Sequence, residues 1–266
     1  MNTHRQLSVN NNEVAKSTER LSSGLKINRA GDDAAGLSIS EKMRSQIRGL
    51  DMASRNAQDG ISMIQTAEGS LNETHDILQR MRELAVQSAN DTNVSVDRDA
   101  LNKEFAQLGK EIQRISTNTD FNTKVLLNGS ISAVKLQVGA NSGQVITVSL
   151  NFKGVTLSAV SKSVTSSYTL NTQISASKAI TGINDQIKLV SNGRSYLGAM
   201  QNRLEHTIKN LDNSSENTSA AESRIRDVDM AKEMMILSKN NILQQAAQAM
   251  LAQANQAPQG VLQLLR

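Results

Sequence analysis

The sequence predicts a mainly α fold: a long antiparallel, coiled-coil-like helical bundle built from both chain ends, with a small β-hairpin region in the middle. Apolar residues recur at alternating steps of three and four over long stretches of both halves, which is the period of packed helices. Strict alternation, the period of strands, is confined to a short middle segment. Aromatic residues make up only 2% of the chain, so the core must be aliphatic.

The first long helix is predicted from the stretch that begins at Met43. One heptad seam holds Met43, Ile47, Leu50, Ala57, Ile61, Ile64, Leu71, Leu78 and Ala85, and it is interrupted by Ser54, Glu68, His75 and Arg82. A seam this long indicates a helix packed against partner helices. Gly49, Gly60 and Gly69 each lower helix propensity by roughly 1 kcal/mol relative to Ala, so packing must offset them.

Turn and cap signals bound the helices of the first half. The Asp32-Asp33 pair predicts a helix N-terminus, where carboxylates complement the macrodipole. Asn90-Asp91-Thr92-Asn93 predicts a turn. A shorter helix follows, with Ser95 or Asp97 as its N-cap and its end within 117–123. Its apolar seam is Leu101, Phe105, Leu108, Ile112 and Ile115.

The middle of the chain changes character. Two alternating runs, 135–138 and 145–150, flank a Gly/Asn loop, which predicts a β-hairpin. Residues 155–160 are interpreted as one more short strand. The Ser/Thr-rich segment 161–177 is interpreted as a surface connection.

The helical period returns from about Thr181. A single seam holds Ile183, Ile187, Val190, Leu197, Leu204, Ile208 and Leu211. We expect the polar run 212–217 to interrupt or loosen this helix, and a last helix to run from about Ala220 to Gln256 and end at Pro258. The Ala/Gln-rich segment 244–257 favours helix but buries little area, so it is marginal alone and suited to packing against other copies.

Composition argues against catalysis and against several partners. His4, His75 and His206 lie far apart, no zinc, nucleophile-elbow or phosphate-loop motif occurs, and there is no Cys. His75 falls on the seam and is expected in the core, whereas His206 is expected to be solvated. We therefore predict no enzyme, no cofactor and no metal site.

Charge and hydropathy point the same way. The net charge is +4, but the basic residues are interleaved with acidic ones, so no nucleic-acid interaction is expected. No apolar stretch is long enough to span a membrane. The polar start, 1–12, lacks a secretory signal peptide.

Several runs resemble the signatures of bacterial flagellins. The amino-terminal ones are LSSGLKINRAGDDAAGL at 21–37, ASRNAQDGIS at 53–62 and LQRMRELAVQ at 78–87. The carboxy-terminal ones are AAESRIRDVDMAKEM at 220–234, QAMLAQANQ at 248–256 and the final LLR. The resemblance covers roughly 3–130 and 183–266. The resemblance implies that the chain starts about ten residues late relative to that family.

The resemblance implies a structural protein that self-polymerises into the extracellular flagellar filament for motility. It implies a D0 domain of terminal helices, 1–34 and 225–266, and a D1 helical bundle, 35–224, with the hairpin element at about 131–160. Outer domains are inferred to be missing. The alternative from the same system is a hook-associated or junction protein.

The resemblance also implies partners and site residues. Flagellins use an export chaperone, the export apparatus, and hook-associated and cap proteins. Some are recognised by a host Toll-like receptor at positions that match Arg80, Leu84 and Glu104 here. On a helical wheel Arg80 and Leu84 fall opposite the apolar face, so we expect both to be exposed, to receptor or to a neighbouring subunit.

The carboxy-terminal helix is implied to bind the chaperone and to take part in D0 assembly. The candidate residues are Met250, Leu251, Leu262, Leu264 and Leu265. Marginal isolated helices order when partners supply packing. We therefore hypothesise that the terminal helices order on assembly.

Overall fold

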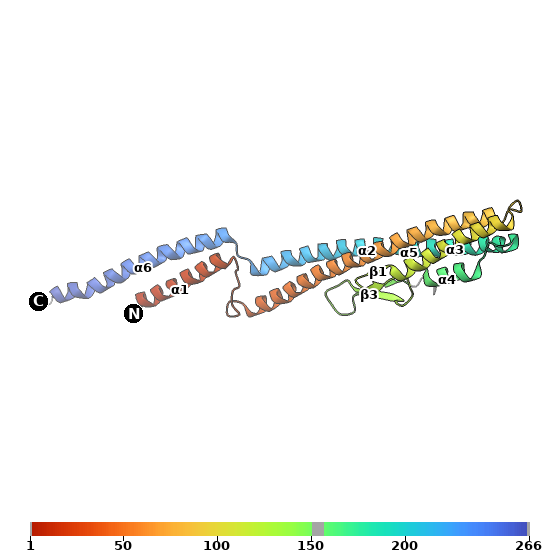
Figure 1. Ribbon diagram of the computed structural model, residues 1–266. Coiled ribbons are helices and arrows are strands. Elements are labelled where there is room, and N and C mark those ends of the chain that lie inside the picture. The colour runs from red at the N-terminus through yellow and green to blue at the C-terminus, as the bar shows by residue number, and fades with distance from the viewer. Residues whose placement is uncertain (1, 151–156, 265–266) are drawn as a thin grey trace. The chain divides into compact units, whose positions relative to one another are not determined.

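A computed structural model describes residues 2–150 and 157–264, with side chains over 4–150 and 157–253 (Figure 1). The helices are α1 (Asn2–Ser23), α2 (Ala34–Ser88), α3 (Ser95–Asn118), α4 (Leu157–Ser167), α5 (Gln173–Arg226) and α6 (Met230–Leu264). The strands are β1 (Asp120–Phe121), β2 (Lys124–Val125), β3 (Ala133–Gln137) and β4 (Val145–Ser149). The mainly α prediction with a small β region is confirmed.

The chain divides into two compact units. One comprises 1–47 and 215–266, and the other comprises 48–214. The boundary falls within α2 and within α5, so each of these helices contributes residues to both units.

The larger unit holds a main hydrophobic core and a smaller cluster of Leu50, Ala53 and Leu211. The main core contains the predicted seam of α2, from Ala57 through Leu78 to Ala85, and the predicted seam of α5, from Ile183 to Leu204. The polar interruption at Ser54 is satisfied, because its hydroxyl donates to Asp212 Oδ1 at 3.0 Å. Polar seam positions are thus compatible with a continuous helix pair.

The acidic pair before α2 acts as predicted. Asp33 Oδ1 accepts from the Gly36 N–H at 2.8 Å, the contact of an N-cap. Asp32 Oδ2 accepts from the main-chain N–H groups of Arg29, at 3.0 Å, and Asn28, at 3.2 Å. These bonds, with the positive charges of Arg20 and Lys16, lower the pKa of Asp32 below its usual range.

The boundaries of α3 differ slightly from expectation. Its N-cap is Val94, and Ser95 is the first helical residue. Asp97 reaches back so that its Oδ2 accepts from the Val94 N–H at 3.3 Å. The helix ends at Asn118, inside the predicted range.

The predicted hairpin is confirmed as an antiparallel pair of β3 and β4. Its register runs from Ala133 opposite Ser149 to Gln137 opposite Val145. On β4 the buried Ile146 and Val148 alternate with exposed residues. The hairpin packs on α2, where Asn56 Nδ2 donates to the Gln137 carbonyl at 3.1 Å.

Two expectations for the segment after the hairpin are wrong. Residues 157–160 begin the helix α4 and form no strand; 155 and 156 lie outside the described residues. The Ser/Thr-rich segment is no surface connection either, because Val164 and Leu170 are fully buried. Ser88 Oγ on α2 donates to the Leu170 carbonyl at 2.7 Å. Burial of these few aliphatic residues outweighs the polar composition around them.

The expected helix ends in the second half also differ. Helix α5 continues through 212–217 to Arg226. In this run Ser214 and Ser215 are half-buried and the other residues are exposed, while Leu211 before it is buried. The break lies instead at 227–229, where Asp229 Oδ1 accepts from the Lys232 N–H at 3.1 Å and caps α6. Helix α6 then runs through Pro258 to Leu264. A Pro in a helix interior removes one main-chain hydrogen bond and crowds the carbonyl four residues earlier, which lowers the stability of a helix by about 3 kcal/mol.

Candidate interaction surfaces

The terminal helices α1 and α6 pack against each other in the smaller unit (Figure 1). Among their described side chains, residues 4–23 and 230–253, only Ser17 and Glu233 are buried. Apolar seam residues such as Val14 and Leu237 are only half-buried. Since apolar burial is the main source of folding free energy, this helix pair has little stability of its own.

Helix α6 instead presents its large apolar side chains to solvent. The exposed ones are Met230, Met234, Met235, Ile242, Leu243 and Met250, with Met235 67% exposed. Four of them line a shallow hollow together with Ser238 and Lys239. A contiguous apolar surface of this kind marks an interaction site.

The carboxy-terminal candidates fall partly on this surface. Met250 is 60% exposed, and Leu251 is half-buried on the side of α6 that carries Glu233. The side chains of Leu262 and Leu264 lie outside the described side chains, and Leu265 lies outside the described residues.

The structure brings Arg80 and Glu104 together. The guanidinium of Arg80 donates from Nε and Nη2 to Glu104 Oε1, both at 3.0 Å, and from Nη1 to Glu83 Oε2 at 3.0 Å. The hydrogen bonds to Glu83 and Glu104 raise the pKa of Arg80. All three side chains are at least 45% exposed, so α2 and α3 share an accessible charged patch.

The expectation that Leu84 is exposed is wrong, because its side chain is only 1% exposed. Helix α2 carries a second heptad seam that the helical wheel omitted, and Leu84 belongs to it. The seam comprises Met63, Ala67, Ser70, Thr74, Ile77, Met81, Leu84 and Ser88, all buried or half-buried. Its Ser and Thr members conceal the period in the sequence.

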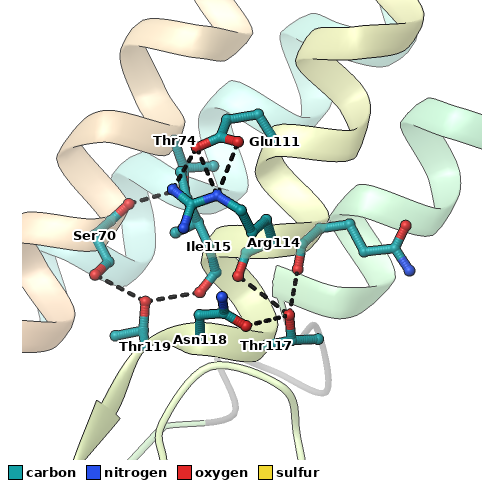
Figure 2. Close-up of polar contacts among 9 residues, drawn as sticks. Ser70, Thr74, Glu111, Arg114, Ile115, Thr117, Asn118 and Thr119 are labelled. Atoms are coloured by element: carbon teal, nitrogen blue, oxygen red, sulfur yellow. Dashed lines mark hydrogen bonds and ion pairs between the residues drawn. The ribbon is translucent and has the colours of Figure 1, made fainter.

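This second seam faces α3, and a polar contact joins α2 to the residue that caps the end of α3 (Figure 2). Thr119 Oγ1 donates to the Ile115 carbonyl at 2.7 Å and lies 3.0 Å from Ser70 Oγ. Arg114 forms an ion pair with Glu111, at 2.6 Å between Nη2 and Oε1, and the bonds from Arg114 lower the pKa of Glu111. The Thr119–Ser70 contact ties the end of α3 to α2, whereas the Arg114–Glu111 pair lies within α3. Neither contact supplies a reactive group.

The histidines and acidic residues form no chemical centre in the described part of the chain. No group of three or more His, Cys, Asp or Glu side chains there could hold a metal ion. His206 is exposed, and His75 is half-buried, with Nε2 2.8 Å from Gln79 Nε2. Within residues 2–150 and 157–264, every helix is too short or too polar to cross a membrane.

Comparison with known proteins gives consistent matches. Residues 1–132 match the bacterial flagellin N-terminal helical region, and 180–265 match the C-terminal helical region. The chain is 65% identical to a flagellin of Halalkalibacterium halodurans over 100% of this chain and 97% of that one. It is 51% identical to a flagellin of Bacillus subtilis, with the same coverage.

A solved structure shows the same fold at low identity. A putative flagellar hook-associated protein from Vibrio parahaemolyticus superposes with a TM-score of 0.60 at 14% identity, over 74% of this chain and 100% of that one. The sequence matches at both ends are to flagellins and do not favour the hook-associated alternative. The chain therefore belongs to the bacterial flagellin family, whose members are structural subunits of the extracellular flagellar filament and not enzymes.

Proposed function

We propose that this chain polymerises through its terminal helices, with 1–34 and 225–266 as the D0 domain and 35–224 as D1. One observation carries the proposal: the α1–α6 pair buries no large apolar side chain in its described part, while α6 leaves six of them exposed. Neighbouring copies supply the missing packing. The terminal helices then gain most of their stability on assembly.

Electron microscopy of the purified chain with short filament seeds tests this proposal. Long filaments are the expected result. Paired substitutions Met235→Ser and Ile242→Ser should prevent growth, whereas Ser238→Ala on the same helix should not. Amide exchange of the soluble chain should show fast exchange in α1 and α6 and slow exchange in 48–214. Slow exchange at both ends of the soluble chain would contradict order on assembly.

The exposed face of α6 is also the proposed site for an export chaperone. Its apolar residues include Met250, and the face must be covered before assembly to keep the subunit soluble. Leu251, Leu262, Leu264 and Leu265 complete the proposed site. A chain truncated before Gln244 should lose chaperone binding in a pull-down, and the single substitution Met250→Ser should weaken it. Full binding by the truncated chain would rule out this site.

A host Toll-like receptor is the proposed partner of the Arg80–Glu104 patch. The support is that both side chains are exposed and share one ion pair. Leu84 cannot form part of the contact surface while its side chain is buried, so its role is to hold α2 against the core. Arg80→Ala should reduce receptor signalling, and Arg114→Ala, an exposed Arg of another ion pair, is the matched control. If Arg80→Ala and the parent chain gave equal receptor signalling, the receptor would not bind this patch.

A further inference from the structure

The contact face between α1 and α6 is a heptad seam in which five of the eleven residues are polar. On α1 it comprises Leu7, Asn10, Val14, Ser17 and Leu21, and on α6 it comprises Glu233, Leu237, Asn240, Gln244, Ala247 and Leu251. These residues are the buried and half-buried ones at alternating steps of three and four. A coiled-coil seam normally carries apolar side chains at these positions, so the polar ones need an explanation.

Two cross-helix polar contacts connect the helices. Arg20 Nη1 lies 3.8 Å from Glu233 Oε1. Nine residues earlier on α1 and eleven later on α6, Gln244 Nε2 donates to Asn11 Oδ1 at 2.8 Å. The two contacts agree on a single antiparallel register, within two residues.

Main-chain contacts at the junction of the two helices hold the same register. Leu25 and Asp227 form an antiparallel bridge. Beside it the Lys26 N–H donates to the Arg226 carbonyl at 2.6 Å, and the Val228 N–H donates to the Gly24 carbonyl at 3.0 Å. The register is therefore fixed at the junction and again along the helices.

The burial of Glu233 lowers the stability of the α1–α6 pair. Its side chain is 6% exposed, whereas that of Arg20 is 32% exposed, and no hydrogen bond to Glu233 Oε1 satisfies that buried oxygen. Burying a carboxylate with one distant partner lowers stability, and an apolar side chain of similar volume would pack better. Polar residues at seam positions are instead known to specify register and partner at the expense of stability.

We propose that Arg20, Glu233, Asn11 and Gln244 select the partner and the register of the terminal helices. They direct α6 to the α1 helix of its own chain and away from that of a neighbouring copy. The apolar side chains of α6 then remain available to other subunits. Only the availability of these apolar side chains to other subunits rests on the proposed function, because the selection of partner and register operates within one chain.

Chemical cross-linking tests the register, and it is simplified by the absence of Cys from the chain. The full chain carries either the in-register pair Val14→Cys and Asn240→Cys, which the two contacts place opposite each other, or the control pair Val14→Cys and Ala247→Cys, two turns away. A short thiol cross-linker is applied to the soluble chain and to filaments. The in-register pair should cross-link within one chain about tenfold more than the control pair, since breaking a buried ion pair is strongly unfavourable.

The same measurement is then made with Arg20→Leu and Glu233→Leu added. The preference for the in-register pair should fall to the level that the main-chain junction alone maintains, and cross-links between chains should appear. An unchanged preference for the in-register pair in this variant would overturn the proposal. Equal reaction of both Cys pairs in the parent chain, in the soluble form and in filaments, would also overturn it. Failure of the proposed function is recognised separately by the absence of filaments, and the soluble chain alone then carries the cross-linking comparison.

A charge exchange tests partner selection wherever the parent chain assembles. Arg20→Glu and Glu233→Arg should each raise the critical concentration about tenfold or more, and the double variant should restore it. Lys16→Glu, one turn earlier and exposed, should change it little. If a mixture of the two single variants restored the critical concentration, the ion pair would lie between chains and the proposal would be overturned. Normal assembly of both single variants would overturn it as well.

Discussion

The side chain of Leu136 in β3 occupies the space that a Cβ atom on Gly60 of α2 would need. Eleven residues earlier, on the same face of the helix, a Cβ on Gly49 would lie 2.8 Å from Ala140 Cβ and 3.1 Å from Ala140 Cα. Glycines that weaken the helix thus allow the hairpin to approach it closely. Gly69 has no such neighbour.

This contrast predicts opposite effects of one substitution along one helix. Gly49→Ala should lower the free energy of unfolding by about 1–3 kcal/mol, because main-chain atoms of the hairpin loop must move. Gly69→Ala should raise it by roughly 1 kcal/mol through helix propensity alone. Gly60→Ala should fall between them, because the end of the Leu136 side chain can rotate away. Urea denaturation measures all three; destabilisation by Gly69→Ala would contradict the explanation.

The burial of Leu84 predicts that it behaves as a core residue. Leu84→Ala should lower the free energy of unfolding by about 2–5 kcal/mol, since it leaves a cavity between α2 and the rest of the core. Arg80→Ala, one turn away and exposed, should leave the melting temperature almost unchanged. Thermal denaturation compares the two. A similar loss in both variants would show that the ion pair, and not the packing, stabilises this segment.

A buried hydroxyl holds the segment after α4 to α2. Ser88→Ala should lower the free energy of unfolding by about 1–3 kcal/mol, because it leaves the buried Leu170 carbonyl without its donor. Ser62→Ala is the matched control, since Ser62 is exposed and bonds only to the Gln58 carbonyl within α2. Chemical denaturation should find the control near neutral. Equal effects in the two variants would assign no role to the Leu170 contact.

The pKa of Asp32 predicts a pH dependence at the start of α2. Because the folded state lowers this pKa below the ordinary value of 3.8, the stabilisation is complete above that value. It is lost as the pH falls through the lower folded pKa. An NMR titration of the carboxyl group should give a midpoint below 3.8. Asp32→Asn should destabilise the segment at pH 7 and make no difference in strong acid; an unshifted midpoint would contradict this assignment.

The long helices were predictable because their seams are aliphatic and regular. The seam of α5 from Ile183 to Leu211 needs only its own period to be recognised. The second seam of α2 was not predicted, because Ser70, Thr74 and Ser88 occupy its buried and half-buried positions. Ser70 and Thr74 donate to carbonyls of the preceding turn. Ser88 donates to the distant Leu170 carbonyl, and composition reveals neither kind of bond. The wrong placement of Leu84 follows directly from that omission.

The other wrong predictions concern polar segments. Some of these segments are packed in the interior, and others remain helical. Segment 161–177 reads as a loop, yet Val164 and Leu170 anchor it in the core. Run 212–217 reads as a break, yet Ser214 Oγ donates back to the Asn210 carbonyl at 2.7 Å and the helix continues. The α1–α6 seam was missed for the same reason, since Ser17, Glu233 and Gln244 hide its heptad period.

The junction between the terminal helices and the rest of the smaller unit consists of main-chain hydrogen bonds. Side chains at 25, 26 and 226–228 can therefore drift during evolution while the crossing of the two segments stays the same. The tolerance ends at two kinds of change. Pro at 26 or 228 would delete a donor, and any side chain at Gly24, where φ is +73°, would strain the turn. In related sequences the side chains at this crossing should therefore vary widely, whereas Gly should be kept at 24 and Pro should be absent from 26 and 228.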